Sequence, residues 1–174
     1  MGQDKARLPF RGGALAEAVA REVAQAAGSV TLVGHAEMGG IPDLYPGEGP
    51  LGGILTALHH TSADWNLILA CDMPQVSAEF LKRLMAAAER TTAGEPGIAM
   101  IVLPYGADGR PEPLCAAYHR RALAGLEAAF GRGIRKVTAA MEGLSVARLD
   151  VPEVAIFQNV NTPEDWSGYA AKRP

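Results

Sequence analysis

The stretch WNLILAC at 65–71 most constrains the fold, because it contains the apolar run LILAC at 67–71, which ends abruptly at Asp72. Strands that are buried on both faces have such runs without polar alternation, and they occur mainly in parallel sheets. A second apolar run lies at 98–103, and both are far shorter than the roughly 20 residues that cross a bilayer. We therefore predict two strands of a buried sheet, at 65–71 and 98–105.

Segments with helical periodicity alternate with these strands. In the segment 13–27, Leu15, Val19 and Val23 recur every fourth residue, and Gly28 stands where a helix would end. Ser77 is placed to cap a helix over 77–90. Such alternation indicates an α/β fold, a three-layer Rossmann-like domain with a mostly parallel sheet over residues 1–174. The other expected elements are strands at 29–35, 114–119 and 145–151, and helices at 54–60, 120–131, 134–143 and after Thr162.

Composition limits the possible functions. The 174 residues are 48% hydrophobic and carry a net charge of −3, which fits one globular domain and gives no electrostatic case for nucleic acid or an anionic membrane as a partner. Cys71 and Cys115 lie far apart and form no C-x-x-C pair, so we expect buried thiols instead of a disulfide or a zinc site. The charged N-terminus lacks the apolar region of a signal peptide, and the expected location is the cytoplasm.

Ligands of parallel α/β sheets bind beyond the carboxyl ends of the strands, so the loops at those ends are candidate sites. Asp72 directly follows the most apolar strand, and a carboxylate there suits Mg²⁺ that bridges substrate phosphates. The competing interpretation is that Asp72 caps a turn or a helix start before Pro74. The candidate loops are 36–53, 72–76, 104–113 and 158–162.

Two further segments fit a phosphorylated ligand. The loop GEGPLGG at 47–53 combines glycines, which allow close backbone approach, with a helix start whose N–H groups can receive an anion. Its alternative is a flexible connection. Lys5 lies ahead of a helix, where a lysine can neutralise charge on transferring phosphates, although the usual fate of a lysine is a solvated surface position.

Asn159 and Asn161 flank a valine, so both point to one face of an extended segment. They can orient a polar substrate or a metal-bound water, or they can serve turn and cap chemistry before Thr162. The histidines have no ligand spacing, and no transition-metal site is predicted.

Five motifs occur in order along nearly the whole chain. They are DKARLPF at 4–10, PGEGPLGGI at 46–54, CDMP at 71–74, RPEPLCAAY at 110–118 and NVNTPEDW at 159–166. Together these motifs resemble the molybdenum cofactor guanylyltransferases of the nucleotidyltransferase superfamily, and GPLGG favours this branch over the related molybdopterin cytidylyltransferases.

The resemblance implies a reaction and a set of site residues. GMP is transferred from Mg²⁺-bound GTP to the molybdopterin cofactor, which yields the guanine dinucleotide cofactor and pyrophosphate. Other molybdenum-cofactor proteins are the implied transient partners. Lys5 and Asp72 are the implied catalytic residues, and Asp72 and Asn161 lie at the metal. The implied nucleotide-binding residues are Lys5, His35, Asp43, Gly49, Pro50, Leu51, Gly52, Gly53 and Asp72, and those on the pterin side are Pro113, Leu114, Asn159 and Asn161.

The sequence departs from the family at its N-terminus. The family signature begins with a strand and then L-A-G-G-x-S-x-R-M-G, of which Met1-Gly2 are present here. The absent run supplies backbone amides for the GTP phosphates and an arginine, and its strand is normally central in the sheet. We expect a start codon assigned too late, in preference to a gene fragment or a protein that has lost transferase activity. His35 is a second departure, because many relatives carry an Asn near this position.

Two other functions remain open at this stage. A sugar-phosphate or molybdopterin cytidylyl nucleotidyltransferase would share the fold, and a panel of nucleotides separates it from the guanylyl reaction. A non-catalytic nucleotide-binding remnant is supported by the absent phosphate loop. The presence of Lys5, Asp43 and Asp72 argues against a remnant.

Overall fold

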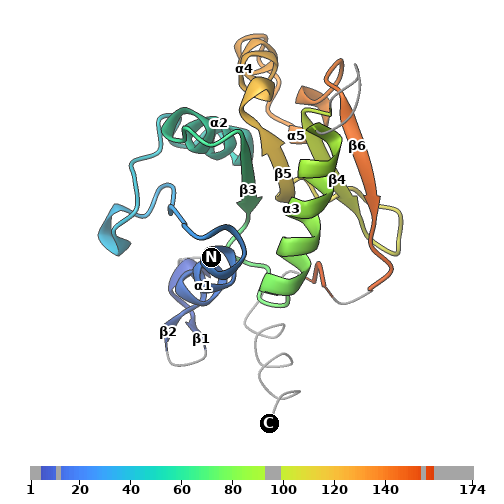
Figure 1. The fold of residues 1–174 in the computed structure, drawn as a ribbon. Coiled ribbons are helices and arrows are strands. Elements are labelled where there is room, and N and C mark those ends of the chain that lie inside the picture. Colours follow the sequence, from blue (N-terminus) through green and yellow to red (C-terminus); the bar gives the residue numbers. More distant parts are fainter. Residues whose placement is uncertain (1–4, 11–12, 93–98, 154–155, 159–174) are drawn as a thin grey trace.

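A four-stranded mixed sheet organises the protein, for which a computed structural model describes residues 5–10, 13–92, 99–153 and 156–158 (Figure 1). The strands lie side by side in the order β3-β5-β4-β6. Their bounds are Trp65–Leu69 for β3, Ile101–Tyr105 for β4, Cys115–His119 for β5 and Val146–Asp150 for β6.

Three of these strands run in one direction and β5 runs in the other. β5 pairs antiparallel with both β3 and β4, whereas β4 pairs parallel with β6. The predicted α/β class with mostly parallel strands is confirmed for β3, β4 and β6, but the hydrogen-bonded neighbours of β5 are antiparallel. The physical reason is the short connection between β4 and β5, since a parallel crossover needs a dozen or more residues.

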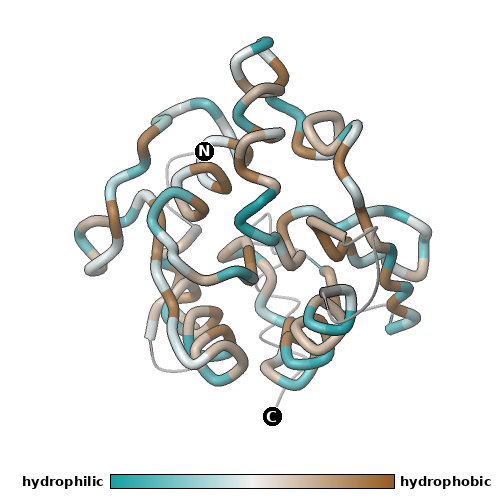
Figure 2. The backbone as a smooth tube through the Cα atoms, turned by 45° about the horizontal axis from the view of Figure 1, so that its top comes forward, coloured by the Kyte–Doolittle hydropathy of each residue, from teal (hydrophilic) through white to brown (hydrophobic). Residues whose placement is uncertain are grey.

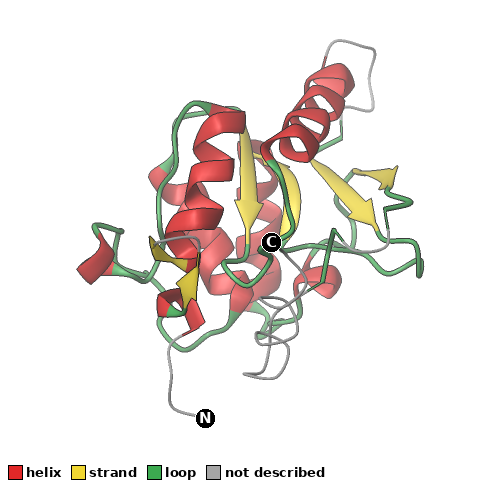
Figure 3. Cartoon of the chain, turned by 90° about the horizontal axis from the view of Figure 1, so that it is seen from below, coloured by secondary structure: helices red, strands yellow, loops and turns green. Residues whose placement is uncertain are grey.

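Helices cover both faces of the sheet, as Figures 1 and 3 show. On one face Ala116 and Tyr118 of β5 pack in a core with α2, α4 and α5. On the other face Cys115 and Ala117 pack in a core with α1 and α3. The helix bounds are Leu15–Ala27 for α1, Pro50–His60 for α2, Ala78–Thr92 for α3, Leu123–Gly131 for α4 and Val137–Ala140 for α5. The shorter elements are η1 at Lys5–Arg7, η2 at Ala36–Met38, η3 at Arg120–Ala122, and the hairpin of β1 at Pro9–Phe10 with β2 at Gly13–Ala14.

The helices form where their periodicity predicts them. In α1 the stripe of Leu15, Val19 and Val23 is buried, and Gly28 ends the helix with a φ of 79° while its N–H donates to Ala24 at 2.8 Å. Figure 2 shows hydrophobic and hydrophilic positions alternating along such coils. At the start of α3, the Ser77 hydroxyl accepts a hydrogen bond from the Phe80 N–H at 3.3 Å, which confirms the predicted cap.

The prediction of a strand at 29–35 is wrong. This segment forms an isolated parallel bridge between Val33 and Ile41, and Val30 is 42% exposed. Its β-branched residues favour extended backbone, but a strand also needs a partner that accepts its hydrogen bonds. None of the described strands pairs with 29–35, because the sheet order β3-β5-β4-β6 does not include this segment.

Other boundaries differ modestly from prediction. α2 begins at Pro50, four residues before the predicted start, because proline is well suited to the first helical position. The helix predicted at 134–143 is limited to α5. β6 alternates between exposed and half-buried residues, as expected of an edge strand. The predicted helix after Thr162 lies outside the described residues.

Two absences apply to the described part of the chain. None of its helices combines the length and hydropathy needed to traverse a bilayer. No disulfide joins Cys71, which is half-buried, to Cys115, which is buried. Burial also raises the pKa of the Cys115 thiol, which keeps it protonated, as expected of a structural cysteine.

Candidate functional site

A cleft of about 830 Å³ lies between α1, the start of α2 and the strand β3. Its lining includes much of the predicted nucleotide site, drawn from segments that are far apart in the sequence. The predicted site residues that line it are His35, Asp43, Gly49, Pro50, Gly53, Asp72 and Leu114.

Asp72 lies just beyond the carboxyl end of β3 and faces this cleft, as the apolar strand predicts. Its side chain is half-buried. Within the described part of the chain, the Asp72 carboxylate makes no hydrogen bond or ion pair, so the alternative role as a cap gains no support. A carboxylate on a cleft wall with no protein partner is available to a ligand or a cation.

Asp43 is held in a defined orientation on the cleft wall. Its Oδ1 accepts hydrogen bonds from the Thr56 hydroxyl at 2.8 Å and from the Tyr45 N–H at 3.0 Å. The Thr56 oxygen also accepts from the Leu44 N–H at 3.0 Å, and Thr56 is only 1% exposed. A buried threonine of α2 thus ties the loop that carries Asp43 to the helix that follows it.

The start of α2 has two positions that require glycine, the cap residue Gly49 and Gly52 in the first turn of the helix. Gly49 has a φ of 77°, which residues other than glycine rarely adopt. A Cβ on Gly52 would lie 2.9 Å from Tyr45 Cβ and 3.1 Å from the Tyr45 carbonyl oxygen. The turn delivers the N-terminal end of α2 to the cleft through Pro50 and Gly53. The free N–H groups and the dipole of that helix end favour an anion there.

Leu51 and Gly52 do not line the cleft, although both belong to the predicted nucleotide loop. The Leu51 side chain is fully buried in the core with α4 and α5, and Gly52 packs under Tyr45. Any contact of these two residues with a nucleotide would therefore be made by the backbone, and their role stays a prediction.

His35 lies on another part of the cleft wall, in the segment that does not form the predicted strand. Its ring is half-buried and lines the cleft, with Nδ1 3.7 Å from a Glu37 carboxylate oxygen. Glu37 also pairs with Arg7 at 2.8 Å, and this pairing lowers the pKa of the Glu37 carboxyl. The ion pair links η1 to the wall that carries His35.

Two of the predicted pterin residues, Pro113 and Leu114, lie at the same edge of the sheet, because β5 runs opposite to its neighbours and therefore begins where they end. The Leu114 carbonyl accepts from the Ala70 N–H at 2.8 Å, beside Asp72. The Pro113 carbonyl accepts from the Tyr118 hydroxyl at 2.7 Å. Pro113 is half-buried and lies outside the cleft lining, so of these two described residues the structure brings Leu114 to the cleft.

Sequence analysis did not select Glu112, which precedes Pro113 at this edge. Burial raises the pKa of its carboxyl, Asp108 adds to the increase, and Arg110 opposes it. The motif RPEPLCAAY contained the signal, because a carboxylate between two prolines lies in a loop at the ligand edge.

The candidate loop at 72–76 also meets Gln158, the first residue of the candidate loop at 158–162 and the one residue of that loop that the structure describes. The Gln75 amide donates to Gln158 Oε1 at 3.0 Å across 83 positions of the sequence. Asn159 and Asn161 are both predicted on the pterin side, and Asn161 also at the metal. Both lie outside the described residues. The backbone of Lys5 lies in η1, but its side chain is outside the description. In the part of the chain that is described, no three His, Cys, Asp or Glu side chains cluster as a metal site.

Comparison with known proteins identifies the family. Residues 1–146 match the family described as the MobA-like NTP transferase domain. This chain belongs to that family. A solved structure of molybdopterin-guanine dinucleotide biosynthesis protein A from Archaeoglobus fulgidus superposes with a TM-score of 0.80 at 30% identity, over 99% of this chain and 93% of that one. The predicted nucleotidyltransferase fold is thereby confirmed.

Curated relatives agree with this assignment. A protein of Methanothermobacter thermautotrophicus named a probable molybdenum cofactor guanylyltransferase is 39% identical over 129 residues, which cover 72% of this chain and 63% of the relative. A protein of the same name from Nostoc is 34% identical over 175 residues, which cover 95% of this chain and 82% of that relative.

Proposed function

We propose that this chain transfers GMP from GTP to the molybdopterin cofactor, forming the guanine dinucleotide cofactor and pyrophosphate. The observation that carries the proposal is the 39% and 34% identity to relatives named for this activity. The cleft supports it, because it gathers the anion-favouring start of α2, the oriented Asp43, and Asp72, whose carboxylate has no partner among the described residues.

In this reaction an oxygen of the pterin phosphate forms a bond to the α-phosphorus of GTP. The bond from the α-phosphorus to the oxygen that bridges it to the β-phosphorus breaks, and pyrophosphate leaves with the electron pair. No covalent bond to the protein is needed, so the chain contributes positioning and charge neutralisation.

We assign the chain's residues to these two tasks. Backbone N–H groups at the start of α2 and the carboxylate of Asp43 bind the ribose and guanine side of the nucleotide. Lys5 neutralises charge on the triphosphate. Leu114, with Pro113, Asn159 and Asn161, lines the pterin side.

Mg²⁺ fits the residues present at this site. Mg²⁺ is typically held by one or two carboxylates together with substrate phosphates and water, and the Asp72 carboxylate has no competing partner among the described residues. Asp72 would hold the ion, with Asn161 close to it, and the ion would neutralise charge on the phosphates.

The test measures pyrophosphate release from GTP in the presence of molybdopterin cofactor and Mg²⁺, with CTP, UTP and a sugar phosphate as the comparison panel. We expect pyrophosphate release when GTP and the pterin are supplied together, and none with CTP, UTP or the sugar phosphate. Asp72→Asn should lower the rate by about 100-fold or more while the circular dichroism spectrum stays that of the wild type. Asp64→Asn is the matched control, because Asp64 is an exposed aspartate at the opposite end of β3.

The same assay is run on a second version of the protein, which is expressed with the in-frame codons upstream of Met1 included. Release by neither version, or release with a sugar phosphate and not the pterin, would overturn the proposal. An unfolded Asp72→Asn variant would make Asp72 a structural residue and would remove the basis of its assignment to the metal.

A further inference from the structure

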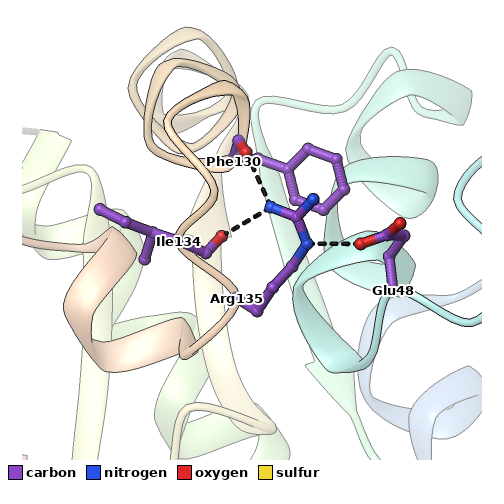
Figure 4. Close-up of polar contacts among 4 residues, drawn as sticks. All are labelled: Glu48, Phe130, Ile134 and Arg135. Atoms are coloured by element: carbon purple, nitrogen blue, oxygen red, sulfur yellow. Dashed lines mark hydrogen bonds and ion pairs between the residues drawn. The ribbon is translucent and has the colours of Figure 1, made fainter.

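Arg135 follows α4 and reaches the glycine-rich turn before α2, although 87 positions separate it from that turn in the sequence. Its Nε donates to Glu48 Oε2 at 2.5 Å, and its Nη1 donates to the carbonyl oxygens of Phe130 at 2.8 Å and Ile134 at 3.2 Å. The guanidinium carbon also lies 3.8 Å from the centroid of the Phe130 ring. Figure 4 shows the guanidinium between the end of α4 and the Glu48 carboxylate.

The Phe130 ring makes a second contact with the same loop. Its centroid lies 4.9 Å from that of Tyr45, with the ring planes at 59°. The Tyr45 N–H donates to the Asp43 carboxylate, and Tyr45 covers Gly52 at the first turn of α2. The end of α4 thus touches the segment 43–53 at two points, Tyr45 and Glu48.

The backbone at Glu48 explains why this contact matters. Glu48 lies between Gly47, with a φ of 81°, and Gly49, with a φ of 77°. Two glycines give this turn more accessible backbone conformations than any other pair of residues would. The Glu48 side chain lies between these glycines, and its contact with Arg135 can restrict the conformations of the turn.

The guanidinium is itself fixed before it meets Glu48. The hydrogen bonds to two carbonyl oxygens and the Phe130 ring set the plane of the guanidinium. The ion pair with Glu48 therefore requires little further ordering of the arginine. An isolated exposed ion pair contributes little to stability. A fixed donor acting on a flexible turn contributes instead by keeping a binding loop in one conformation.

We propose that Arg135 is a positioning residue for the nucleotide-binding turn, acting through Glu48 and Phe130. This inference rests on the proposed function, because it assigns the turn to GTP. Arg135 and Glu48 lie outside the cleft lining, so the effect reaches the nucleotide through the turn and not by direct contact.

Steady-state kinetics of Arg135→Gln tests the proposal. We expect KM for GTP to rise about tenfold with kcat changed less than about twofold, since coupling within such contact networks is commonly of this size. Glu48→Gln breaks the same contact from the other side and should have the same effect. The double variant should be no worse than either single variant, because both remove one interaction.

Arg148→Gln is the matched control. Arg148 also stacks on an aromatic ring, with its guanidinium carbon 4.0 Å from the centroid of Tyr105, and donates to Asp150 at 2.7 Å. It lies on β6, away from the turn. This variant should keep the wild-type KM for GTP.

Hydrogen exchange of a peptide spanning 45–53, measured without nucleotide, separates this inference from the proposed function. Arg135→Gln and Glu48→Gln should exchange faster there than the wild type and Arg148→Gln. A wild type that transfers no GMP refutes the function and leaves the exchange contrast standing as the test of the contact. Wild-type exchange and an unchanged KM in both Arg135→Gln and Glu48→Gln would overturn the inference.

Discussion

The two walls of the cleft are held to the fold in different ways. Side chains tie the wall at 43–53 to the rest of the fold, through Asp43 to Thr56 of α2 and through Glu48 to Arg135, which lies between α4 and α5. The wall at 29–41 is shaped by its own backbone, with Ile41 N–H donating to Leu32 at 2.8 Å and Gly34 N–H donating to Ile41 at 2.9 Å. One wall is anchored to the core, and the other is mainly a local turn.

Strand-forming residues alone do not make a strand. The segment 29–35 has the β-branched composition of a strand, yet among the described residues its backbone hydrogen bonds reach no farther than Ile41. The glycine-rich turn has the composition of a flexible connection, yet it has a defined conformation. Tertiary partners decided the outcome in both cases, and four predictions test this view.

The largest effect is expected at the first turn of α2, where two adjacent glycines differ in their surroundings. Gly52→Ala places a methyl group 2.9 Å from Tyr45 Cβ, whereas a Cβ on Gly53 meets nothing within 4 Å. Alanine is the better helix former at both positions. We expect Gly53→Ala to be neutral or stabilising and Gly52→Ala to lie about 3 kcal/mol below it.

Urea unfolding of the two glycine variants measures this difference directly. Equal stability of Gly52→Ala and Gly53→Ala would show that Tyr45 moves away freely, and would contradict an anchored wall.

The next largest effect concerns the buried hydroxyl behind Asp43. Thr56→Val removes the donor to Asp43 and leaves the Leu44 N–H without its acceptor, so we expect a loss of about 1–2 kcal/mol in the free energy of unfolding. Thr61→Val is the control, because the Thr61 hydroxyl accepts from the Ala63 N–H at an exposed position. In thermal melts, Thr56→Val should have a lower midpoint than Thr61→Val. An unchanged midpoint of Thr56→Val would mean that water replaces the hydroxyl.

A smaller global effect is expected on the opposite wall. A Cβ on Gly40 would lie 2.7 Å from the Leu32 carbonyl oxygen and 2.9 Å from that of His35, so Gly40→Ala must reshape 29–41. Because this wall is folded mainly on itself, we expect the loss of global stability to stay below about 1 kcal/mol.

Limited proteolysis of Gly40→Ala should show new cleavage within 29–41, with 43–53 as the internal reference that stays protected. Cleavage at both segments would show that the two walls are coupled, and the contrast between them would fail.

The smallest effect is expected at Val30, which is 42% exposed in the segment predicted as a strand. Val30→Thr keeps the shape and β-branching of the side chain and should change stability by less than about 0.5 kcal/mol. A loss above 1 kcal/mol in a urea titration would indicate that this residue is packed in solution, as the original strand prediction requires.

The sequence by itself determined the elements whose signal is local. The apolar stripe and Gly28 set the length of α1, Ser77 marked the start of α3, and the apolar run at 65–71 located β3 with Asp72 at its end. These signals suffice because helix periodicity, caps and a buried run depend on residues that are close in the chain.

Features that depend on distant partners could not be predicted from the sequence. β5 joins antiparallel, although its composition is compatible with either direction, and for that reason the Leu114 carbonyl meets the Ala70 N–H, two residues before Asp72. Arg135 carries no motif, and its contact with Glu48 exists because α2 and α4 pack on the same face of the sheet. No local pattern encodes such a contact, since its two halves are brought together only when the core between them forms.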